Sequence, residues 1–414
     1  MSVAEKFLNP EVRKCPFPMY RDMRESEPVS YIPELDMYFV ASYDLVLEVV
    51  RNPVVFSSKG PKSAGGARTK INFCAKANEI VNSQGFGRAV PTLVNNDPPT
   101  HGEFRKLVQQ TFRVSRIRQM GEYVQQIVDE LLDRIGDRSE FDINTELAIT
   151  LPMYVIADQI GVEREDFEKF KLWSEAFIVH YRPPKPEHEL IEAAELVVEA
   201  QQYLATRMAQ HRAEPKDDII SELVNATLKD GRPLTDHEVM SVLEQLLVAG
   251  NDTTTNGIGN GILYLARHPE VRRRLIDNPD LISNFVEEIL RMESPVQGLV
   301  RTTTQETELA GIKLREGQTL ILGYASASRD DSKFADGDSF DLDRTNAGAH
   351  LAFGSGIHHC VGSELARVEM RIAFASFLKK FPDFELAIDE DELVYSPVFA
   401  NRSLVSLPIR VIRN

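Results

Sequence analysis

Apolar positions recur with helical spacing along most of the chain, and only short stretches alternate as strands do. The clearest helical pattern begins after Thr235 and runs to Arg267, where His268 and Pro269 close it. The stretch from Thr235 to Glu238 fits a capping box, in which each of the two side chains bonds a free amide of the first turn. At about 1.5 Å per residue, this pattern predicts a helix roughly 50 Å long that crosses the whole protein.

Shorter helices and a few strands account for most of the remaining pattern. Helical spacing marks four further ranges: 42–51, 101–211 (broken at 136–140 and by the prolines at 183–186), 281–291 and 363–380. Loose alternation at 29–40 predicts an edge hairpin, and alternation at 308–322 and again up to Ile412 predicts further strands. The range 58–94 is rich in Gly, Ser, Lys and Asn and lacks a period, so we expect a long loop with one helical turn.

Helices therefore dominate, and the predicted fold is mainly α with small peripheral β-sheets. The chain shows no internal repeat and no low-complexity tract. We expect a single domain over residues 1–414. Its β-rich lobe is expected at about 25–60, 295–345 and 385–414, and the remainder forms a helix-rich lobe.

Composition places the chain among ordinary globular proteins, with 43% hydrophobic and 27% charged residues. The chain has three cysteines: Cys15, Cys74 and Cys360. A small and odd number of cysteines does not suit a disulfide framework, so the composition favours a reducing compartment. The chain has no signal-peptide pattern and no run of about 18 apolar residues. A net charge of −16 disfavours nucleic acid as a partner. We expect a cytoplasmic protein without a membrane partner.

Positive charge nevertheless gathers in one stretch of the predicted helical region. This stretch carries five basic residues and no carboxylate: Arg105, Lys106, Arg113, Arg116 and Arg118. A solvated helix face and a docking patch for an acidic partner both fit this pattern.

The most informative stretch runs from Phe353 to Gly362 and leads directly into a helix start at Ser363. Its glycines let the backbone approach a flat ligand closely. Cys360 would lie at the head of that helix, where the dipole and backbone amides favour a thiolate and lower its pKa. Two other interpretations stay open at this point. Cys360 could be a small buried hydrophobe, or it could bind zinc together with His358 and His359, although adjacent residues converge poorly on one ion.

The same stretch resembles the haem-binding signature of the cytochrome P450 family. Six residues match it in type and spacing: Phe353, Gly354, Gly356, His358, Cys360 and Gly362. The resemblance covers nearly the whole chain and is weakest before His101. It implies a triangular helical prism around a buried haem b, with Cys360 as the axial thiolate ligand of the iron. Phe353 would pack beside the haem, and His358 would contact a propionate.

The resemblance also assigns roles to residues elsewhere in the chain. His101, Arg105 and Arg301 would join His358 in binding the propionates, since buried carboxylates need cationic or hydrogen-bonding partners. Glu288 and Arg291 share a helix face and would form a buried structural pair, with Arg344 as its third member.

A poorly helical stretch interrupts the long helix at Ala249, Gly250, Asn251, Asp252 and Thr253. A bond from Thr253 back to a carbonyl could widen the helix beside the iron. In the family this position carries an acid–alcohol pair, so Asp252 would relay protons and Thr253 would hold dioxygen and water, with Ala249 and Gly250 beside the haem. The alternative is a kink without chemistry.

Together these features imply a haem-thiolate monooxygenase that uses O2 to hydroxylate or epoxidise a small to medium apolar molecule, such as a terpenoid, aromatic or steroid-like compound. Electrons would come from NAD(P)H through a ferredoxin reductase and a ferredoxin docked on the basic stretch, and the protein is expected to be a monomer. The alternatives are a haem-thiolate peroxygenase and a non-catalytic haem-binding sensor, which the acid–alcohol pair disfavours. The expected pocket includes the loop 58–94, the helices flanking Pro183, and eight residues: Leu246, Val248, Ala249, Val296, Gln297, Leu299, Val398 and Phe399.

Overall fold

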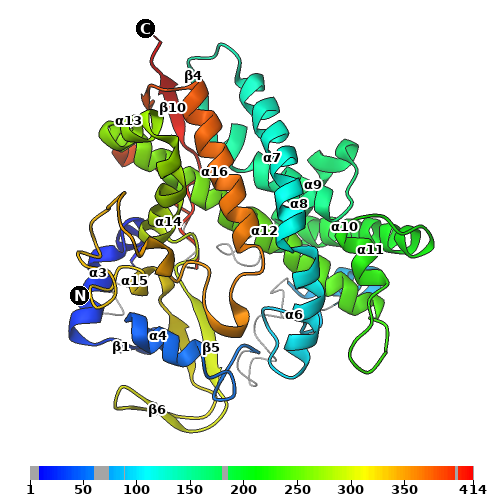
Figure 1. Cartoon of the computed structure of the whole chain (residues 1–414). Helices are drawn as coiled ribbons and strands as arrows, with labels where there is room; N and C mark the ends of the chain where they lie inside the picture. Colours follow the sequence, from blue (N-terminus) through cyan, green and yellow to red (C-terminus); the bar gives the residue numbers. More distant parts are fainter. Residues whose placement is uncertain (1–8, 60–73, 88, 180–184, 397–399, 414) are drawn as a thin grey trace.

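The computed structural model describes residues 9–59, 74–87, 89–179, 185–396 and 400–413. Helices make up most of this part of the chain, as the apolar pattern predicted (Figure 1). The helices are α2 (Pro10–Lys14), α3 (Phe17–Ser26), α4 (Tyr43–Val50), α5 (Ala75–Gln84), α6 (Thr100–Thr111), α7 (Val114–Ile135), α8 (Thr150–Gln159), α9 (Phe167–Ile178), α10 (Glu187–Ala213), α11 (Ile219–Val224), α12 (Asp236–Arg267), α13 (Pro269–Asp277), α14 (Ile282–Glu293), α15 (Tyr324–Ala327) and α16 (Ser363–Lys380). Within the described ranges, none of these helices is both long enough and apolar enough to span a membrane.

Within the described part of the chain, ten strands form three small sheets at the periphery. They are β1 (Val29–Ile32), β2 (Met37–Val40), β3 (Phe56–Ser57), β4 (Glu140–Asp142), β5 (Leu299–Thr303), β6 (Thr307–Leu309), β7 (Ile312–Leu314), β8 (Thr319–Leu322), β9 (Phe384–Leu386) and β10 (Pro408–Val411). The largest sheet has the order β1-β2-β8-β5-β3, and β2 and β8 are its parallel pair. The expected hairpin at 29–40 is confirmed as β1 and β2.

The strands predicted at 308–322 and near the C-terminus belong to different sheets. β6 and β7 form a separate hairpin, whereas β8 lies in the five-stranded sheet. β10 pairs with β4 and β9, so the C-terminal segment joins the helix-rich part of the chain rather than the large sheet. Of the three segments expected in the β-rich lobe, 25–60 and 295–345 contribute strands to the large sheet and 385–414 does not.

The long helix α12 begins and ends where the sequence predicted. The Thr235 side chain accepts a hydrogen bond from the Glu238 amide, and the Glu238 carboxylate accepts one from the Thr235 amide. Both partners of the capping box are thus present. The helix passes through the middle of the molecule and contacts α8, α14 and α16 (Figure 1).

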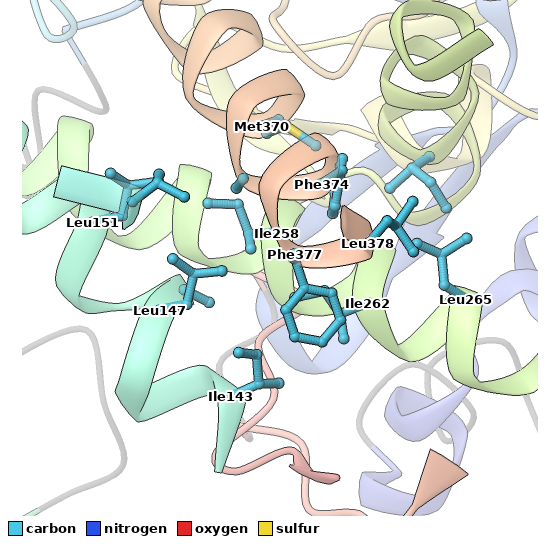
Figure 2. Close-up of a cluster of buried hydrophobic side chains, with 14 of the residues drawn as sticks. Ile143, Leu147, Leu151, Ile258, Ile262, Leu265, Met370, Phe374, Phe377 and Leu378 are labelled. Carbon is cyan, nitrogen blue, oxygen red and sulfur yellow. The ribbon is translucent and has the colours of Figure 1, made fainter. Parts of the chain in front are cut away.

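Glycines on the second half of α12 allow its neighbours to approach closely. A Cβ atom on Gly261 would lie 2.3 Å from Cζ of Phe374, and one on Gly259 would lie 2.6 Å from Oδ1 of Asn144. Figure 2 shows the result: side chains of α16 such as Phe374 and Phe377 pack against Ile262 of α12. This packing fixes α16, and with it the loop that carries Cys360, against the long helix.

Six helices of the described ranges were missing from the sequence prediction: α2, α3, α5, α11, α13 and α15. α5 occupies residues 75–84 of the range expected to be a loop, and α13 lies between the two helices predicted at 235–267 and 281–291. Both are short. α5 buries only Ala77 and Val81, so its apolar pattern is too sparse to recognise.

Candidate functional site

The stretch from Phe353 to Gly362 folds into a tight loop closed by its own backbone. The Cys360 amide donates to the Phe353 carbonyl at 2.9 Å. Gly354 and Gly356 have φ angles of 66° and 69°, a region that glycine adopts at little cost. A Cβ atom on Gly356 would also lie 2.9 Å from the Val50 carbonyl oxygen. The loop can therefore pack against α4 only because this position is glycine.

The Cys360 thiol faces a cavity inside the protein. The side chain is solvent-accessible because it borders this cavity. Burial among protein atoms raises the pKa of the thiol, while the Gly362 amide and the positive charges of Arg105 and Arg367 pull it down. The expectation of a lowered pKa was therefore wrong for the protein alone, because burial outweighs the stabilising groups. A metal cation bound to the sulfur would shift the balance to the thiolate.

Four side chains that can carry positive charge line the same cavity: His101, Arg105, Arg301 and His358. The rings of His101 and His358 lie 4.2 Å apart between centroids, and Ser58 Oγ lies 3.0 Å from His358 Nε2. Burial lowers the pKa of His101, and the nearby guanidinium groups of Arg105 and Arg301 lower it further. This side of the cavity is therefore built for an anion.

Arg105 gives the clearest indication that the cavity binds an anionic group. Its Nε atom is buried and has no hydrogen-bond partner among the described residues. A buried N–H donor without an acceptor is costly, so an anionic group in the cavity would be favoured. A thiol donor, a cluster of cationic groups and a glycine-rich loop together fit a haem, whose iron takes a thiolate and whose propionates take cations.

Glu288, Arg291 and Arg344 form a buried charge cluster behind the cysteine loop. Arg291 donates to both carboxylate oxygens of Glu288 at 2.7 Å, and Nε of Arg344 lies 3.1 Å from Oε1. Glu288 and Arg291 have no solvent exposure. Arg291 also donates to the carbonyls of Ser328 and Gly337. The structure thus brings the three residues together and uses them to hold the 328–344 segment, which leads into the cysteine loop, against α14.

The two members of the expected acid–alcohol pair point in different directions. Thr253 borders the cavity, and its hydroxyl donates to the Ala249 carbonyl at 3.0 Å. Gly250 also borders the cavity and packs against Ile156 of α8. The Asp252 carboxylate is instead contacted by Nδ2 of Asn401 at 3.4 Å. Asp252 is not among the described residues that line the cavity.

Some of the residues expected in the substrate pocket line this cavity and others do not. Leu246, Ala249, Val296 and Leu299 border the cavity. Val248 does not, because it faces the core formed by α8, α10 and α11. Gln297 is buried elsewhere and is held by the Tyr20 hydroxyl and the Ser294 carbonyl, so the expectation of an amide near the iron was wrong. Val398, Phe399 and Pro183 lie outside the described residues.

The basic stretch does not act as one surface. Arg105 faces the cavity, and Arg116 is buried, where it pairs with Glu222 at 2.8 Å and donates to the Asp217 carbonyl. Lys106, Arg113 and Arg118 are exposed. The expected docking patch is therefore reduced to three exposed cations, because helix geometry turns the other two inward.

Among the cavity residues that the sequence analysis did not name, one is acidic. Glu369 of α16 is 3% exposed and lines the cavity, and its Oε2 has no hydrogen-bond partner within the described ranges. Burial raises its pKa to about 8, so the carboxyl is protonated at neutral pH. The signal in the sequence is a glutamate four residues after Leu365 and four before Ala373, both of which are buried on the same face.

The sequence analysis also missed an ion-pair group next to the cysteine loop. The Glu287 carboxylate contacts the Arg367 guanidinium at 2.6 Å and His350 at 3.3 Å. Burial would raise the pKa of Glu287, but these two partners hold it at about 2. The Arg367 guanidinium lies 4.6 Å from the centre of the Phe353 ring.

The zinc alternative gains no support, since no three His, Cys, Asp or Glu side chains are grouped to hold an ion in the described part of the chain.

Comparison with known proteins bears directly on this site. A family model described as Cytochrome P450 matches residues 54–397. Cytochrome P450 107B1 of Saccharopolyspora erythraea is 35% identical over 396 residues, which is 94% of each chain. The structure of CYP109Q5 from Chondromyces apiculatus matches with a TM-score of 0.86 and 31% identity, over 99% of this chain and 98% of that one. CYP109E1 from Bacillus megaterium, solved in complex with corticosterone, matches with a TM-score of 0.83 and 33% identity, over 97% and 99%.

Proposed function

Since the chain belongs to the cytochrome P450 family, we propose that this monooxygenase hydroxylates or epoxidises a small to medium apolar molecule with electrons from a ferredoxin. One oxygen atom of O2 enters the substrate. The other oxygen atom takes up two electrons and two protons and leaves as water. The observation that carries the proposal is the single cavity where Cys360, four potential cations and an apolar wall meet.

The cofactor of the family is haem b, bound through a cysteine thiolate. When bound, it supplies dioxygen activation, which the thiolate promotes by donating electron density. Cys360 is the ligand in this proposal, with the Gly362 amide directed at its sulfur. His101, Arg105, Arg301 and His358 hold the propionates, and Phe353 packs beside the ring. Ala249 and Gly250 leave room for it next to α12.

Proton handling falls to α12. The Thr253 hydroxyl donates its hydrogen bond to the Ala249 carbonyl. Its oxygen can therefore still accept a hydrogen bond from a water or a ligand in the cavity. Asp252 relays protons from outside and must leave Asn401 to do so. The Thr253 hydroxyl at the cavity favours the monooxygenase over a peroxygenase or a haem sensor, neither of which has to deliver protons to dioxygen.

The apolar wall indicates the class of substrate. Leu246, Val296 and Leu299 line the cavity, and Leu93 and Ile156 join them. Such a surface favours a molecule that gains by leaving water and makes few polar contacts. A terpenoid, an aromatic or a steroid-like compound meets this condition. The corticosterone complex of CYP109E1 shows that a structural neighbour accepts a steroid.

Electrons reach this protein from NAD(P)H through a ferredoxin reductase and an acidic ferredoxin. Lys106, Arg113 and Arg118 form the docking surface, and Lys106 lies next to the cavity residue Arg105. The protein acts as a cytoplasmic monomer, in keeping with the three free cysteines among the described residues.

Charge reversal tests this docking surface. Arg113→Glu combined with Arg118→Glu should raise KM for ferredoxin several-fold and weaken its dependence on salt, because rim charges act mainly on association. Arg134→Glu, on the exposed face at the other end of α7, is the matched control. Equal KM values for the double variant and the control would contradict the proposed surface.

The first test of the function is spectroscopic. The purified protein is reduced with dithionite, exposed to carbon monoxide and recorded as a difference spectrum. The red-shifted Soret band that names the family is expected for the wild type and not for Cys360→Ser. A band at the position of histidine-ligated haem, or the same band in both proteins, would remove Cys360 from the iron.

A further inference from the structure

The segment 89–96, here called the strap, has no regular secondary structure and lies beside α12. Two of its backbone amides donate to side chains of that helix: Val90 to Oγ of Ser241 at 2.8 Å and Val94 to Oε1 of Gln245 at 3.0 Å. Ser241 and Gln245 are one helical turn apart, so they present their acceptors on the same face. The strap is thus fastened to α12 at two points.

Gln245 makes a third bond that ties the strap and the helix together. Its Nε2 atom donates to Oγ1 of Thr92 at 2.5 Å and to the Ser241 carbonyl at 2.9 Å. Both amide protons and the amide oxygen are therefore engaged. Gln245 borders the cavity, yet its polar atoms already bond the protein. Its role is to position the strap rather than to bind a ligand.

The strap forms part of the cavity wall. Leu93 and Val94 both line the cavity. Leu93 is buried in the core shared with α8 and α10, whereas Val94 is 43% exposed. The position of the strap therefore sets the width of the cavity at this side.

A second fastening lies just before the strap and uses the same helix. Oε1 of the buried Gln201 on α10 accepts the Phe86 amide at 2.8 Å, and its Nε2 donates to Glu244 at 2.7 Å. Glu244 and Gln245 are adjacent on α12, so one turn of this helix holds both the strap and the chain that leads into it. The strap has no strand partner, so these side chains largely determine where it lies.

We infer that Gln245 is a positioning residue that sets the size of molecule admitted to the cavity, by holding Leu93 and Val94 in the wall. This inference rests on the proposed function, since the cavity is taken as the substrate site. Losing Gln245 removes the bonds to Val94 and Thr92. Each hydrogen bond of this kind changes an opening equilibrium by roughly 5-fold, so opening of the strap should rise by about 5- to 30-fold.

The test uses the haem-loaded protein and the variant Gln245→Met, which keeps the length of the side chain and removes its hydrogen bonds. Gln202→Met, at an exposed position on α10, is the matched control, and Ser241→Ala removes only the fastening at Val90. Amide hydrogen exchange of residues 89–96 is measured together with the binding rates of imidazole and 4-phenylimidazole, whose nitrogen binds haem iron.

In the Gln245→Met variant, the amide hydrogens of the strap should exchange faster than in the wild type, and those elsewhere should not. The variant should bind 4-phenylimidazole at least about 5-fold faster than the wild type, and its imidazole binding rate should stay within about 2-fold. Ser241→Ala should change exchange at Val90 and leave Val94 protected. Unchanged exchange in the strap, or equal acceleration of both azoles, would overturn the inference. Absence of the thiolate band with carbon monoxide in the wild type would refute the proposed function, and the exchange measurement would still decide the role of Gln245.

Discussion

The buried cluster at Glu288 allows a test in which burial is the variable. Glu288→Gln keeps the shape of the side chain and removes its charge. The native carboxylate faces Arg291 and Arg344 and accepts the Asp341 amide at 2.8 Å. After the change, two buried guanidinium groups face a neutral amide. Breaking a buried pair in this way costs about 3–5 kcal/mol, because the remaining charges are neither hydrated nor paired.

The chain offers a control with the same chemistry at the surface. Nη2 of Arg274 lies 2.9 Å from each carboxylate oxygen of Asp343, and the two side chains are 49% and 63% exposed. Asp343→Asn should therefore cost less than about 1 kcal/mol, since water replaces the lost partner. Both variants remove a carboxylate from arginine, but Glu288 serves two buried guanidinium groups and Asp343 serves one exposed guanidinium.

Urea unfolding of the haem-loaded proteins at pH 7, followed by far-ultraviolet circular dichroism and by the Soret band, measures both effects. Glu288→Gln should move the midpoint strongly to lower urea, whereas the carbon monoxide spectrum of its folded fraction stays that of the wild type, as Glu288 does not line the cavity. Similar midpoint shifts for Glu288→Gln and Asp343→Asn would show that burial of the cluster does not govern its contribution.

Three further outcomes follow from packing, ionisation and ion pairing. Gly261→Ala should lower stability by about 1–3 kcal/mol in a thermal or urea melt, because its Cβ meets Phe374, whereas Gly121→Ala, with open space around it on α7, should raise stability by up to about 1 kcal/mol. Glu369 is protonated in the fold up to its pKa of about 8 and ionises near 4.5 when unfolded, so wild-type stability should fall by about 1.4 kcal/mol per pH unit between these values. Glu369→Gln should abolish that slope and be the more stable protein at pH 8–9 by up to several kcal/mol; parallel pH profiles would contradict the assignment. Arg116→Gln should lower the unfolding midpoint and leave KM for ferredoxin unchanged, because Arg116 is buried against Glu222.

The sequence predicts best the elements whose ends carry their own signals. α12 has a capping box at Thr235 and a proline after its end, and α16 follows a glycine and keeps its apolar spacing to Lys380. These signals are local, so they survive without knowledge of the fold. α13 begins with a proline, but its nine residues include three successive arginines that hide the apolar face.

For the site, the sequence spacing predicted which segments of the chain lie close together. It did not predict the direction in which each side chain points. Neighbouring helix residues point about 100° apart, so Ala249 reaches the cavity and Val248 does not, and Thr253 faces the cavity while Asp252 meets Asn401. Arg116 shows the same limit. Its inward direction depends on Glu222 of α11, more than 100 residues away, which no local pattern reveals.

The parallel pairing of β2 with β8 has a consequence for synthesis of the chain. Met37 pairs with Thr319, so the two strands are separated by about 280 residues. At roughly 5–20 residues per second, the ribosome needs about 15–60 s to supply β8 after β2 has been made. During this time the β1–β2 hairpin exposes an open edge on β2 that can pair with other chains. Cys360 is made later still, so the protein must keep its first strands from aggregating before it can hold its haem.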